Sequence, residues 1–524
     1  MIEVLFWSAV VRVVQAAVEA APTVIVGILV AAIFQRVLGR EQTLAVFGGR
    51  TWRQIPQAWA MGMLLPVCSL GAIPVMTELR KAGLIGGTIL AFGLTAPIFN
   101  PLSVLYGLTL SHPVVILTIC MASLALVTIM GLFWDRIFKN EFVEPESMVS
   151  TPYGIRRVAS VLLAMLRIAY SRDSLYMLIG VSGVGMLSMM LAANSLQQSA
   201  ESNDWTAPLK MAAVALPAYV TPMTAMVQLA TMFQHGNSIA AAFTLLILGT
   251  GLNLGMIFWI GKTYQWQKAF VWISVAVLLV LVIAYAIEKP LYPEGVQSEG
   301  HTHAFDQFCR PIGNESTSPM TTAKSLIYDS TPAFAGYSLG IFAALVLLGG
   351  IAYAIDPKQT WEQRLAGVND AGLMKAGYES QQPVTLRRDI VIPPKITGLI
   401  AIGGLVWASV YGCYIYYPTP PVVYEQLQVA NAEVSTRVMS KDWAGALYWI
   451  PTMEDWLRKL QVGMYLRGES FSPEQFKQLD ALMHSIEELE DHISDEKYDE
   501  ATAIGKKFAY DYFLFRQSTS TGVE

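Results

Sequence analysis

The chain has 524 residues, of which 54% are hydrophobic and only 14% are charged, and its formal net charge is -5. A water-soluble protein of this length needs more charged surface, so the composition excludes an ordinary soluble enzyme or binding protein. Residues 418–524 hold 10 Lys or Arg and 18 Asp or Glu, a net of -8, which leaves +3 for the rest of the chain. Neither part has the basic excess typical of nucleic-acid binding, and we expect no nucleic acid among the partners.

Several long segments carry no charge at all. Pro113–Trp134 has no charged side chain, and 269–287, 333–355 and 396–417 are comparable. Each is about as long as the roughly 20 residues that cross a bilayer as a helix. We therefore predict an all-α polytopic membrane protein with the lipid bilayer as a partner. The first apolar segment lacks a basic start, so we expect it to be retained as a span and not cleaved as a signal peptide.

The first part of the chain predicts a re-entrant hairpin among full spans. Its expected elements are a helix at about 9–35, a hairpin at about 55–79, a broken helix at 84–110 and a helix at 113–134. The first helix is followed by arginines, which mark the cytoplasmic side. Arg80 and Lys81 follow the second segment, and a break between Pro66 and Pro74 would return them to that same side. A hairpin therefore fits the charges better than a full crossing.

The second part predicts the same series in the opposite orientation. Its expected elements are a helix at 174–196, a hairpin at about 208–234, a crossing at 236–260 and another at 269–287. The loop 197–207 contains Glu201 and Asp204 but neither Lys nor Arg, so we place it outside. A hairpin that follows this loop enters from outside. Two inverted repeats of this kind are common in secondary transporters.

These elements give six expected segments. They are permease repeat 1 (1–135), a basic cytoplasmic linker (136–172), permease repeat 2 (173–290), an external histidine-containing loop (291–332), two extra spans with a cytoplasmic loop at 356–395 (333–417) and an acidic, external, soluble helical domain (418–524). In the last segment Ser472-Pro473-Glu474-Gln475 predicts a helix start, and Ser494 predicts another. We expect a multi-pass protein of the cytoplasmic membrane whose C-terminal domain is periplasmic. A homodimer or an external protein is its candidate partner.

The two repeats match in one spacing. Gly83 precedes Asn100 by the same number of positions as Gly236 precedes Asn253. The upstream proline-to-glycine spacing differs, because Pro74 is closer to Gly83 than Pro222 is to Gly236. Backbone groups freed at helix breaks cannot face lipid without a cost of several kcal/mol, so they must line protein or a wet cavity. The breaks are therefore the expected place for a solute.

Polar and helix-breaking residues at these breaks are the candidate site. The substrate-binding candidates are Cys68, Ser69, Pro74, Thr77, Glu78, Thr95, Pro97, Asn100, Pro217, Thr221, Pro222 and Asn253. Glu19 and Glu78 are the candidates for proton coupling, because ionisable groups within spans are commonly functional. Two alternatives remain open: Glu78 could pair with Arg80 or Lys81, and Glu19 could form a ladder with Arg12 and Gln15.

The first hairpin also carries a family resemblance. Residues 65–74 read Leu-Pro-Val-Cys-Ser-Leu-Gly-Ala-Ile-Pro, followed by Leu-Arg-Lys-Ala-Gly at 79–83 and Leu-Ala-Phe at 90–92. Over residues 10–290 the chain resembles the bacterial predicted-permease superfamily that includes organoarsenical efflux permeases and relatives assigned to metal efflux. The resemblance implies a permease fold, a site at the hairpins and an efflux direction. Family members commonly have a second cysteine where Leu70 stands, and soft-metal capture needs more than one thiolate. We therefore carry over the fold and not the cargo.

Other chemistry is sparse. His301, His303 and Cys309 are ligand types for copper or zinc in an outer loop, or ordinary residues of a solvated loop. Cys309 could alternatively pair with Cys413. No phosphate loop, haem attachment motif or nucleophile elbow is present in the sequence, so we expect neither an enzyme nor a cofactor.

The sequence thus leaves two functions. One is a secondary permease that moves a small solute or ion past the paired breaks. The alternative is a membrane-anchored scaffold or sensor that keeps a degenerate permease fold and recruits a partner with its acidic C-terminal domain.

Overall fold

The computed structural model describes most of the chain as helices. The described residues are 1–48, 53–99, 101–110, 113–138, 156–192, 195–234, 236–292, 302, 305–313, 318–329, 333–366, 394–494 and 497–520. Within these ranges every regular element is helical. The chain divides into two compact units: unit 1 holds nearly all residues up to Ser409, and unit 2 holds Val410–Glu524 together with Leu108–Leu110.

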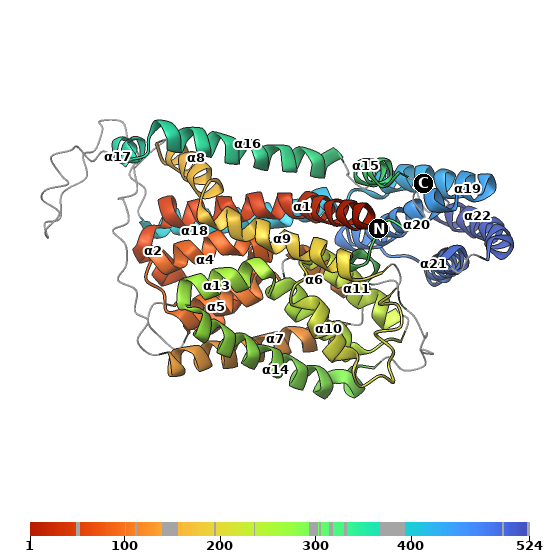
Figure 1. The fold of residues 1–524 in the computed structure, drawn as a ribbon, viewed down its shortest axis with the longest axis horizontal. Coiled ribbons are helices and arrows are strands. Elements are labelled where there is room, and N and C mark those ends of the chain that lie inside the picture. Colours follow the sequence, from red (N-terminus) through yellow and green to blue (C-terminus); the bar gives the residue numbers. More distant parts are fainter. Residues whose placement is uncertain are drawn as a thin grey trace, which may run out of the picture. The chain divides into compact units, whose positions relative to one another are not determined.

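Six helices among the described residues are long and apolar enough to cross a membrane. They are Ile2–Val46, which comprises α1 (Ile2–Ile33), η1 (Phe34–Leu38) and α2 (Gly39–Val46), and then α7 (Pro113–Ile137), α9 (Arg172–Met190), α14 (Trp266–Leu291), Gly336–Ile355 within α16 (Ala333–Ile355) and Leu399–Tyr416 within α18 (Pro394–Tyr416). A bent pair of shorter helices makes a seventh candidate. The prediction of an all-α polytopic membrane protein is therefore confirmed. Figure 1 shows α1, α4 and α9 of unit 1 side by side.

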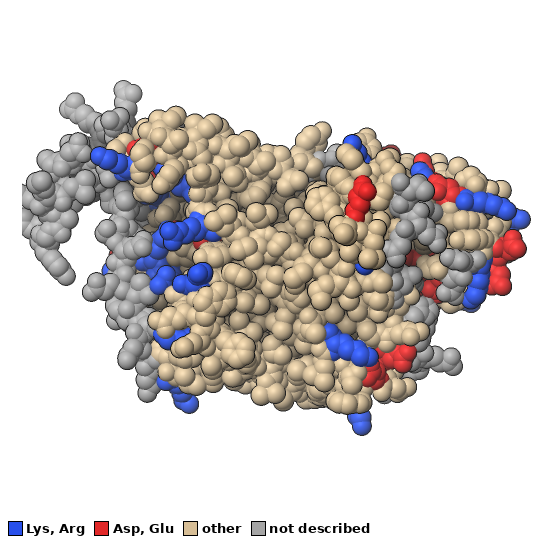
Figure 2. Space-filling model, in the orientation of Figure 1, with Lys and Arg blue, Asp and Glu red and all other residues tan. Residues whose placement is uncertain are grey.

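Unit 1 exposes the large apolar side chains that lipid requires. Leu117 on α7 is 63% exposed, and Phe270 and Leu278 on α14 are 73% and 63% exposed. Contiguous apolar exposure of this kind is costly in water and favourable in hydrocarbon. On the face shown in Figure 2, the middle of unit 1 carries no charged side chain, and Lys and Arg gather near the end where α2 and α8 lie.

The first half of unit 1 contains two broken helices. The pieces are α3 (Gln54–Leu64) and α4 (Ser69–Lys81), then α5 (Gly86–Thr95) and α6 (Pro101–Leu110). The first break falls at residues 65–68 and includes Pro66, as expected. Pro74, however, lies inside α4, so the prediction that it breaks the hairpin is wrong. One proline within a helix removes a single hydrogen bond, and surrounding helices can tolerate it in a membrane protein.

The second half repeats these helix starts at a constant separation in sequence, which we call the repeat spacing. Its pieces are α10 (Ala207–Ala215), α11 (Pro222–Gln234), α12 (Ile239–Thr244) continued by η2 (Leu245–Gly249), and α13 (Leu254–Tyr264). The starts of α3, α4, α5, α6 and α7 at positions 54, 69, 86, 101 and 113 recur in α10, α11, α12, α13 and α14 at positions 207, 222, 239, 254 and 266. Pro222 thus matches Ser69 and not Pro74. The axes of α12–η2 and α13 bend by 53° at their break.

Two helices at equivalent places in the halves, α7 and α14, meet end to start. Trp134, near the end of α7, stacks edge-on against Trp272, near the start of α14, with ring centroids 6.4 Å apart. The Trp272 Nε1 also donates to the carbonyl oxygen of Met130 at 3.4 Å. The end of one helix therefore lies beside the start of the other.

The same carboxylate contact holds α5 and α12. The backbone N–H of Gly87 donates to Asp135 Oδ1 at 2.9 Å, and that of Ala240 donates to Glu288 Oε2. Both the donors and the acceptors of these two contacts are separated by the repeat spacing. A carboxylate satisfies an N–H that the first turn of a helix leaves without an intrahelical partner. In each half, a carboxylate on a later helix thus holds the start of the broken helix.

Both ends of the pair α3/α4 lie near the start of α5. The Thr88 hydroxyl donates to Gln54 Oε1 at 3.1 Å, which places the start of α3 there. The end of α4 reaches the same place through a turn at Gly83, whose φ of +88° suits glycine. In the second half the backbone N–H of Ser238 donates to the carbonyl oxygen of Ala200 at 2.9 Å, so the segment before α10 lies beside the start of α12.

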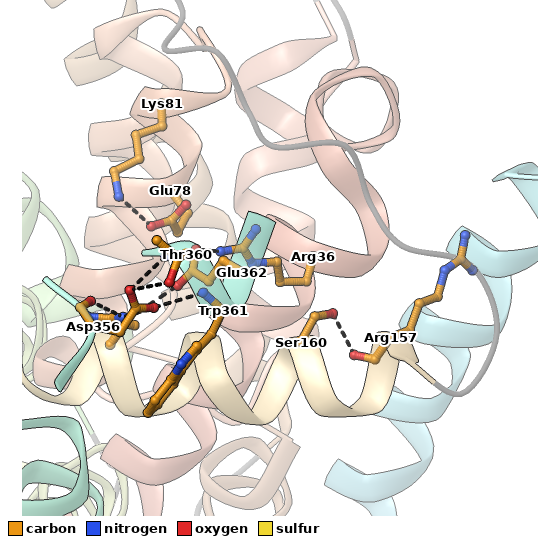
Figure 3. A network of polar contacts seen from close by, with 10 residues as sticks. Arg36, Glu78, Lys81, Arg157, Ser160, Asp356, Thr360, Trp361 and Glu362 are labelled. Atoms are coloured by element: carbon orange, nitrogen blue, oxygen red, sulfur yellow. Dashed lines mark hydrogen bonds and ion pairs between the residues drawn. The ribbon is translucent and has the colours of Figure 1, made fainter. Parts of the chain in front are cut away.

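Four more of the described helices belong to unit 1, and ion pairs hold two of them in place. They are α8 (Arg156–Ala169), α15 (Pro319–Asp329), α16 and α17 (Thr360–Ala366). Figure 3 shows Arg36 of η1 beside Glu362 of α17, and both side chains are buried. Arg167 of α8 contacts Asp356 at 3.2 Å and Glu362 at 3.7 Å. Because a buried charge is costly without its partner, these pairs fix α17 against α1 and α8.

Unit 2 contains a set of four helices with its own core. They are α19 (Pro420–Ser440), α20 (Trp443–Leu466), α21 (Pro473–Ser494) and α22 (Tyr498–Ser520). Their buried faces meet in one apolar cluster that includes Leu427, Leu460 and Phe508. At the start of α21, Ser472 Oγ accepts from the Gln475 N–H at 3.2 Å and the Ser472 N–H donates to Gln475 Oε1 at 2.8 Å. The expected capping box is therefore present.

Candidate functional site

The candidate site begins at the break between α3 and α4. Cys68 precedes α4, and its Sγ accepts a hydrogen bond from the Gly71 N–H at 3.4 Å. A side chain in this position satisfies one of the N–H groups that a helix start leaves unpaired. Cys68 and Ser69 are both fully buried. The thiol that the sequence offered as a ligand is thus already engaged as a helix cap.

Asn253 connects this break to the second half. It precedes α13, and its Oδ1 accepts from the Met256 N–H at 3.0 Å. Its Nδ2 donates to Ser69 Oγ at 2.8 Å, and both residues are fully buried. Two half-helix starts from opposite halves therefore meet through one neutral polar contact. Such a contact is stabilising only when its groups are paired, as they are here.

The start of α11 carries a contact with a carboxylate. Thr221 precedes Pro222, and its Oγ1 accepts from the Thr224 N–H at 3.2 Å. Both threonine hydroxyls also contact Glu19 of α1, that of Thr221 at 2.7 Å. The nearby Tyr219 hydroxyl lies beside the Cys68 thiol. Glu19 is exposed, whereas Thr221 is buried.

Arg12 does not share this contact. Its Nη1 donates to Gln15 Oε1 at 3.2 Å, and its other nitrogens donate to the carbonyl oxygens of Asp306 and Cys309 at 2.7 Å and 3.0 Å. The ladder that the sequence left open on this face therefore joins Arg12 to Gln15. Glu19 contacts Thr221 and Thr224 at the start of α11.

Glycines allow the backbones around the breaks to approach closely. A Cβ at Gly27 of α1 would lie 2.4 Å from the carbonyl oxygen of Gly71 in α4. Gly180 of α9 follows Gly27 at the repeat spacing, and a Cβ at Gly180 would lie 2.5 Å from Leu70 Cδ2 and 2.8 Å from Asn253 Oδ1. Only glycine leaves room for these crossings.

A second polar group lies further along α4. The Thr77 hydroxyl lies 3.1 Å from Asp173 Oδ1 of α9 and accepts from Trp259 Nε1 of α13 at 2.9 Å. Nearby, Lys81 Nζ donates to Glu78 Oε1 at 2.8 Å, and Glu78 is 2% exposed. The ion-pair alternative for Glu78 is therefore the one present in the structure.

Asp173 is the residue that the sequence analysis missed. It is 8% exposed and follows Ser171, whose Oγ accepts from the Asp173 N–H at 3.2 Å. In the sequence it stands beside Arg172 at the edge of a basic linker, where a charge is ordinary. Its position at the start of an apolar span was the one available signal.

The remaining candidates are more dispersed. Thr95 donates to the carbonyl oxygen of Ala91 at 2.7 Å, as hydroxyls in helices commonly do. Pro97 is buried in the turn after α5, and the carbonyl oxygen of Pro217 packs against Gly183. Asn100, His301 and His303 lie outside the described residues.

The metal candidates are not brought together where the structure can be described. Cys309 is buried, and its thiol lies 3.8 Å from Ser195 Oγ. No group of three or more His, Cys, Asp or Glu residues suited to a metal ion occurs within the described ranges. Cys309 and Cys413 are both free thiols, so the alternative that they form a disulfide is wrong.

Membrane-spanning helices, together with broken ones whose capped starts meet in the interior, define a membrane protein of the permease class. Comparison with known proteins specifies the family. The model of a family described as "Predicted permease" matches residues 7–289, more than half of the chain, and the protein belongs to this family. The match covers α7, α9 and the broken helices between α3 and α13, and it ends before α15–α18 and the four helices α19–α22.

One curated relative belongs to a bacterium. The chain is 22% identical over 276 residues to the UPF0718 protein YcgR of Bacillus subtilis (strain 168). The aligned residues cover 51% of this chain and 92% of the relative. No solved structure matches. The similarity therefore supports a transporter and names no cargo.

Proposed function

We propose that the protein is a secondary permease that moves a small solute or ion across the cytoplasmic membrane. The observation that carries this proposal is the contact between Asn253 and Ser69, through which half-helix starts from the two halves meet in the buried interior. Half-helix ends bring partial charges and polar backbone groups to the middle of a bilayer, where a solute can bind. We propose efflux as the direction because of the family resemblance.

The proposed architecture is two inverted repeats, residues 1–135 and 173–290, each with a re-entrant hairpin. Three observations support it. The helix starts recur at the repeat spacing, α7 and α14 run antiparallel, and the ends of each short pair lie near the start of the next helix. Equivalent helices that run antiparallel are what a two-fold axis in the membrane plane requires.

Three polar contacts between the halves mark the proposed path. Glu19 of the first half meets the start of α11, Ser69 meets Asn253, and Thr77 meets Asp173. Ser69 and Thr77 lie on α4 about 12 Å apart along the helix axis, at a rise of about 1.5 Å per residue. All three contacts bridge the surface along which one repeat would rock against the other.

The proposed topology places Arg36, Arg167 and the start of α5 on the cytoplasmic side. Basic residues at that end of unit 1 support it. The linker 136–172 and the loop 356–395 would then be cytoplasmic. The loop 291–332 and the acidic domain 418–524 would be periplasmic.

The proposed cargo is not a soft metal ion. The Cys68 sulfur caps α4 and has no second cysteine beside it in its helix, because Leu70 stands where relatives commonly have one. Soft-metal sites in proteins use several thiolates. The solute site is better described as one lined by hydroxyls and an amide.

Unit 2 supports a second candidate, a scaffold or sensor that recruits an external protein or a second copy. It has its own apolar core and an acidic composition, and it lies outside the family match. A domain of this kind can bind a partner without taking part in transport.

The permease and the scaffold differ in which residues are needed to change the solute content of cells. We would express the wild type, Asn253→Ala, Asn203→Ala and a form without residues 418–524, and compare solutes in cells and medium by mass spectrometry. Asn203, in an exposed loop, provides the matched control. A permease predicts a solute whose cell content depends on Asn253 and on neither the control position nor the tail. Changes that depend only on residues 418–524 would favour the scaffold, and no Asn253-dependent solute would overturn the permease.

A further inference from the structure

Three oxygen atoms form a closed triangle where α1 meets the start of α11. Thr221 Oγ1 lies 2.7 Å from Glu19 Oε1 and 2.8 Å from Thr224 Oγ1. Thr224 Oγ1 also contacts the same Glu19 oxygen. Each atom is thus within hydrogen-bonding distance of the other two.

This triangle has one proton too few if Glu19 is ionised. Each threonine hydroxyl supplies one proton, and a carboxylate supplies none. Two protons can serve only two of the three contacts. The Thr224 N–H already donates to Thr221 Oγ1 and adds nothing to the oxygen-to-oxygen contacts. A proton on Glu19 or a cation among the oxygens would satisfy the third contact.

The surrounding groups favour a cation over an anion. Helix starts attract anions through unpaired N–H groups. Here the Gly71, Met256 and Thr224 N–H groups already donate to protein side chains. Glu19, when ionised, brings a negative charge to the start of α11. Hydroxyl and carboxylate oxygens suit hard cations better than soft ones.

Glu19 is the member of the triangle that lies at the surface of unit 1. Its side chain is exposed, although it lies well inside a helix that is long enough to cross the membrane. Thr221 on the other side of the contact is 5% exposed. The triangle therefore has an open side at the carboxylate and a closed side at the break.

We propose that Glu19, Thr221 and Thr224 form a binding site for a hard monovalent cation, a proton or an alkali metal ion, that is coupled to transport. This inference rests on the proposed permease function and deepens it. A proton would convert the Glu19 carboxylate to a carboxylic acid and supply the missing third hydrogen bond. An alkali ion would instead be held by the three oxygens.

Few other titratable groups face this position. The Cys68 thiol comes from α4, and the Tyr219 hydroxyl comes from the segment between α10 and α11. On α1 itself Arg12 is engaged with loop carbonyls, and α15 packs on the first turns of α1, where Lys324 is exposed. The charged groups of α8 and α17 lie with Arg36 towards the end of the span.

The test is a binding measurement on the purified full chain in detergent and needs no transported solute. Thermal unfolding is followed in one series from pH 5 to pH 9 in choline chloride. A second series at pH 8 replaces choline chloride by NaCl at constant ionic strength. The variants are Glu19→Gln, Thr224→Val and Thr224→Ser, with Glu201→Gln as a matched control in an exposed loop.

A ligand that binds the folded state alone at about 100 times its Kd stabilises that state about 100-fold, enough to raise Tm by at least about 2 °C. We expect this rise in the wild type on acidification for a proton, or on NaCl addition for an alkali ion. Glu19→Gln and Thr224→Val should lose it, because each removes an oxygen or its charge. Thr224→Ser and Glu201→Gln should keep it.

The inference is overturned if the wild type shows neither response, or if Glu19→Gln and Thr224→Val respond as the wild type does. Should Glu19→Gln not fold, the contrast between Thr224→Val and Thr224→Ser decides. Failure of the permease function is a separate outcome. A cation response without any Asn253-dependent solute overturns the proposed function alone, and solute movement without a Glu19-dependent response overturns this inference alone.

Discussion

The two halves of unit 1 share the positions of their helices and differ in many of the residues around the helix breaks. Helix starts, the carboxylate that holds α5 or α12, and the glycine pair Gly27 and Gly180 all recur at the repeat spacing. Among the residues at the breaks, Asn100 and Asn253 recur at this spacing, but others do not. By the same spacing Cys68 corresponds to Thr221, and Glu19 corresponds to Arg172. Shared positions therefore maintain the shape, and the polar side chains that surround the breaks differ between the halves.

The largest loss of stability is expected for substitution of Gly27, and it should exceed the loss at Gly180. Gly27→Ala should destabilise by about 3 kcal/mol, because its Cβ would meet backbone atoms of Gly71 at 2.4 Å to 2.5 Å that cannot move away. Gly180→Ala should cost only about 1 kcal/mol, since the nearest atoms end side chains. Thermal unfolding in detergent measures both, with Gly340→Ala as the helical control that meets nothing within 4 Å. Equal losses at positions 27 and 180 would show that the crossings are alike.

Removing the hydrogen bond between Asn253 and Ser69 should cause the second-largest loss of stability. Asn253→Ala deletes the cap of α13 and the bond to Ser69, and we expect a loss of about 2 kcal/mol. Ser69→Ala removes only the shared bond. A double-mutant cycle should give a coupling of about 1 kcal/mol between the two positions. Additive effects would mean that the contact does not join the halves.

The carboxylate caps should have equal and smaller effects. Asp135→Ala and Glu288→Ala each remove one acceptor at a helix start, which costs about 1 kcal/mol. Asp135→Asn, which keeps an oxygen acceptor, should retain part of that stability. Thermal unfolding in detergent compares the three variants with the wild type. A difference above about 1 kcal/mol between the alanine variants would break the equivalence of the two halves.

The smallest effect is expected at Cys68. A serine hydroxyl can accept from the Gly71 N–H as the thiol does, so Cys68→Ser should change stability by less than about 1 kcal/mol. Any Asn253-dependent solute should also still move in this variant. Loss of that movement would indicate that the thiol itself binds the cargo.

Much of the fold could be predicted because spans and breaks leave local signals. The uncharged segment at 333–355 coincides with α16, and the first hairpin breaks at Pro66 as expected. The break between α12 and α13 contains no proline, and it was expected from the repeat, at Asn253. The break predicted at Pro74 was wrong, because a proline inside a helix that packs against neighbouring helices need not end it.

The site could be predicted only in part because its contacts join distant residues. The sequence offered Asn253 and Ser69, but nothing in their spacing predicts that they touch across 184 residues. Glu19 was identified, but its contact with Thr221 was not predicted, because its own helix is visible in the sequence and its packing against α11 is not. Asp173 was overlooked beside the basic linker. Local periodicity gives positions on an element, whereas packing decides which elements meet.

The central claim is that the two halves are inverted around the contact between their breaks. Arg53 and Thr206 precede α3 and α10 and are equivalent by the repeat spacing. After the four native cysteines are replaced by serine, a single cysteine at each position would be labelled in intact cells with a membrane-impermeant maleimide. Inversion predicts labelling at position 206 from outside and at position 53 only after the membrane is opened. Labelling of both positions from the same side would contradict the account.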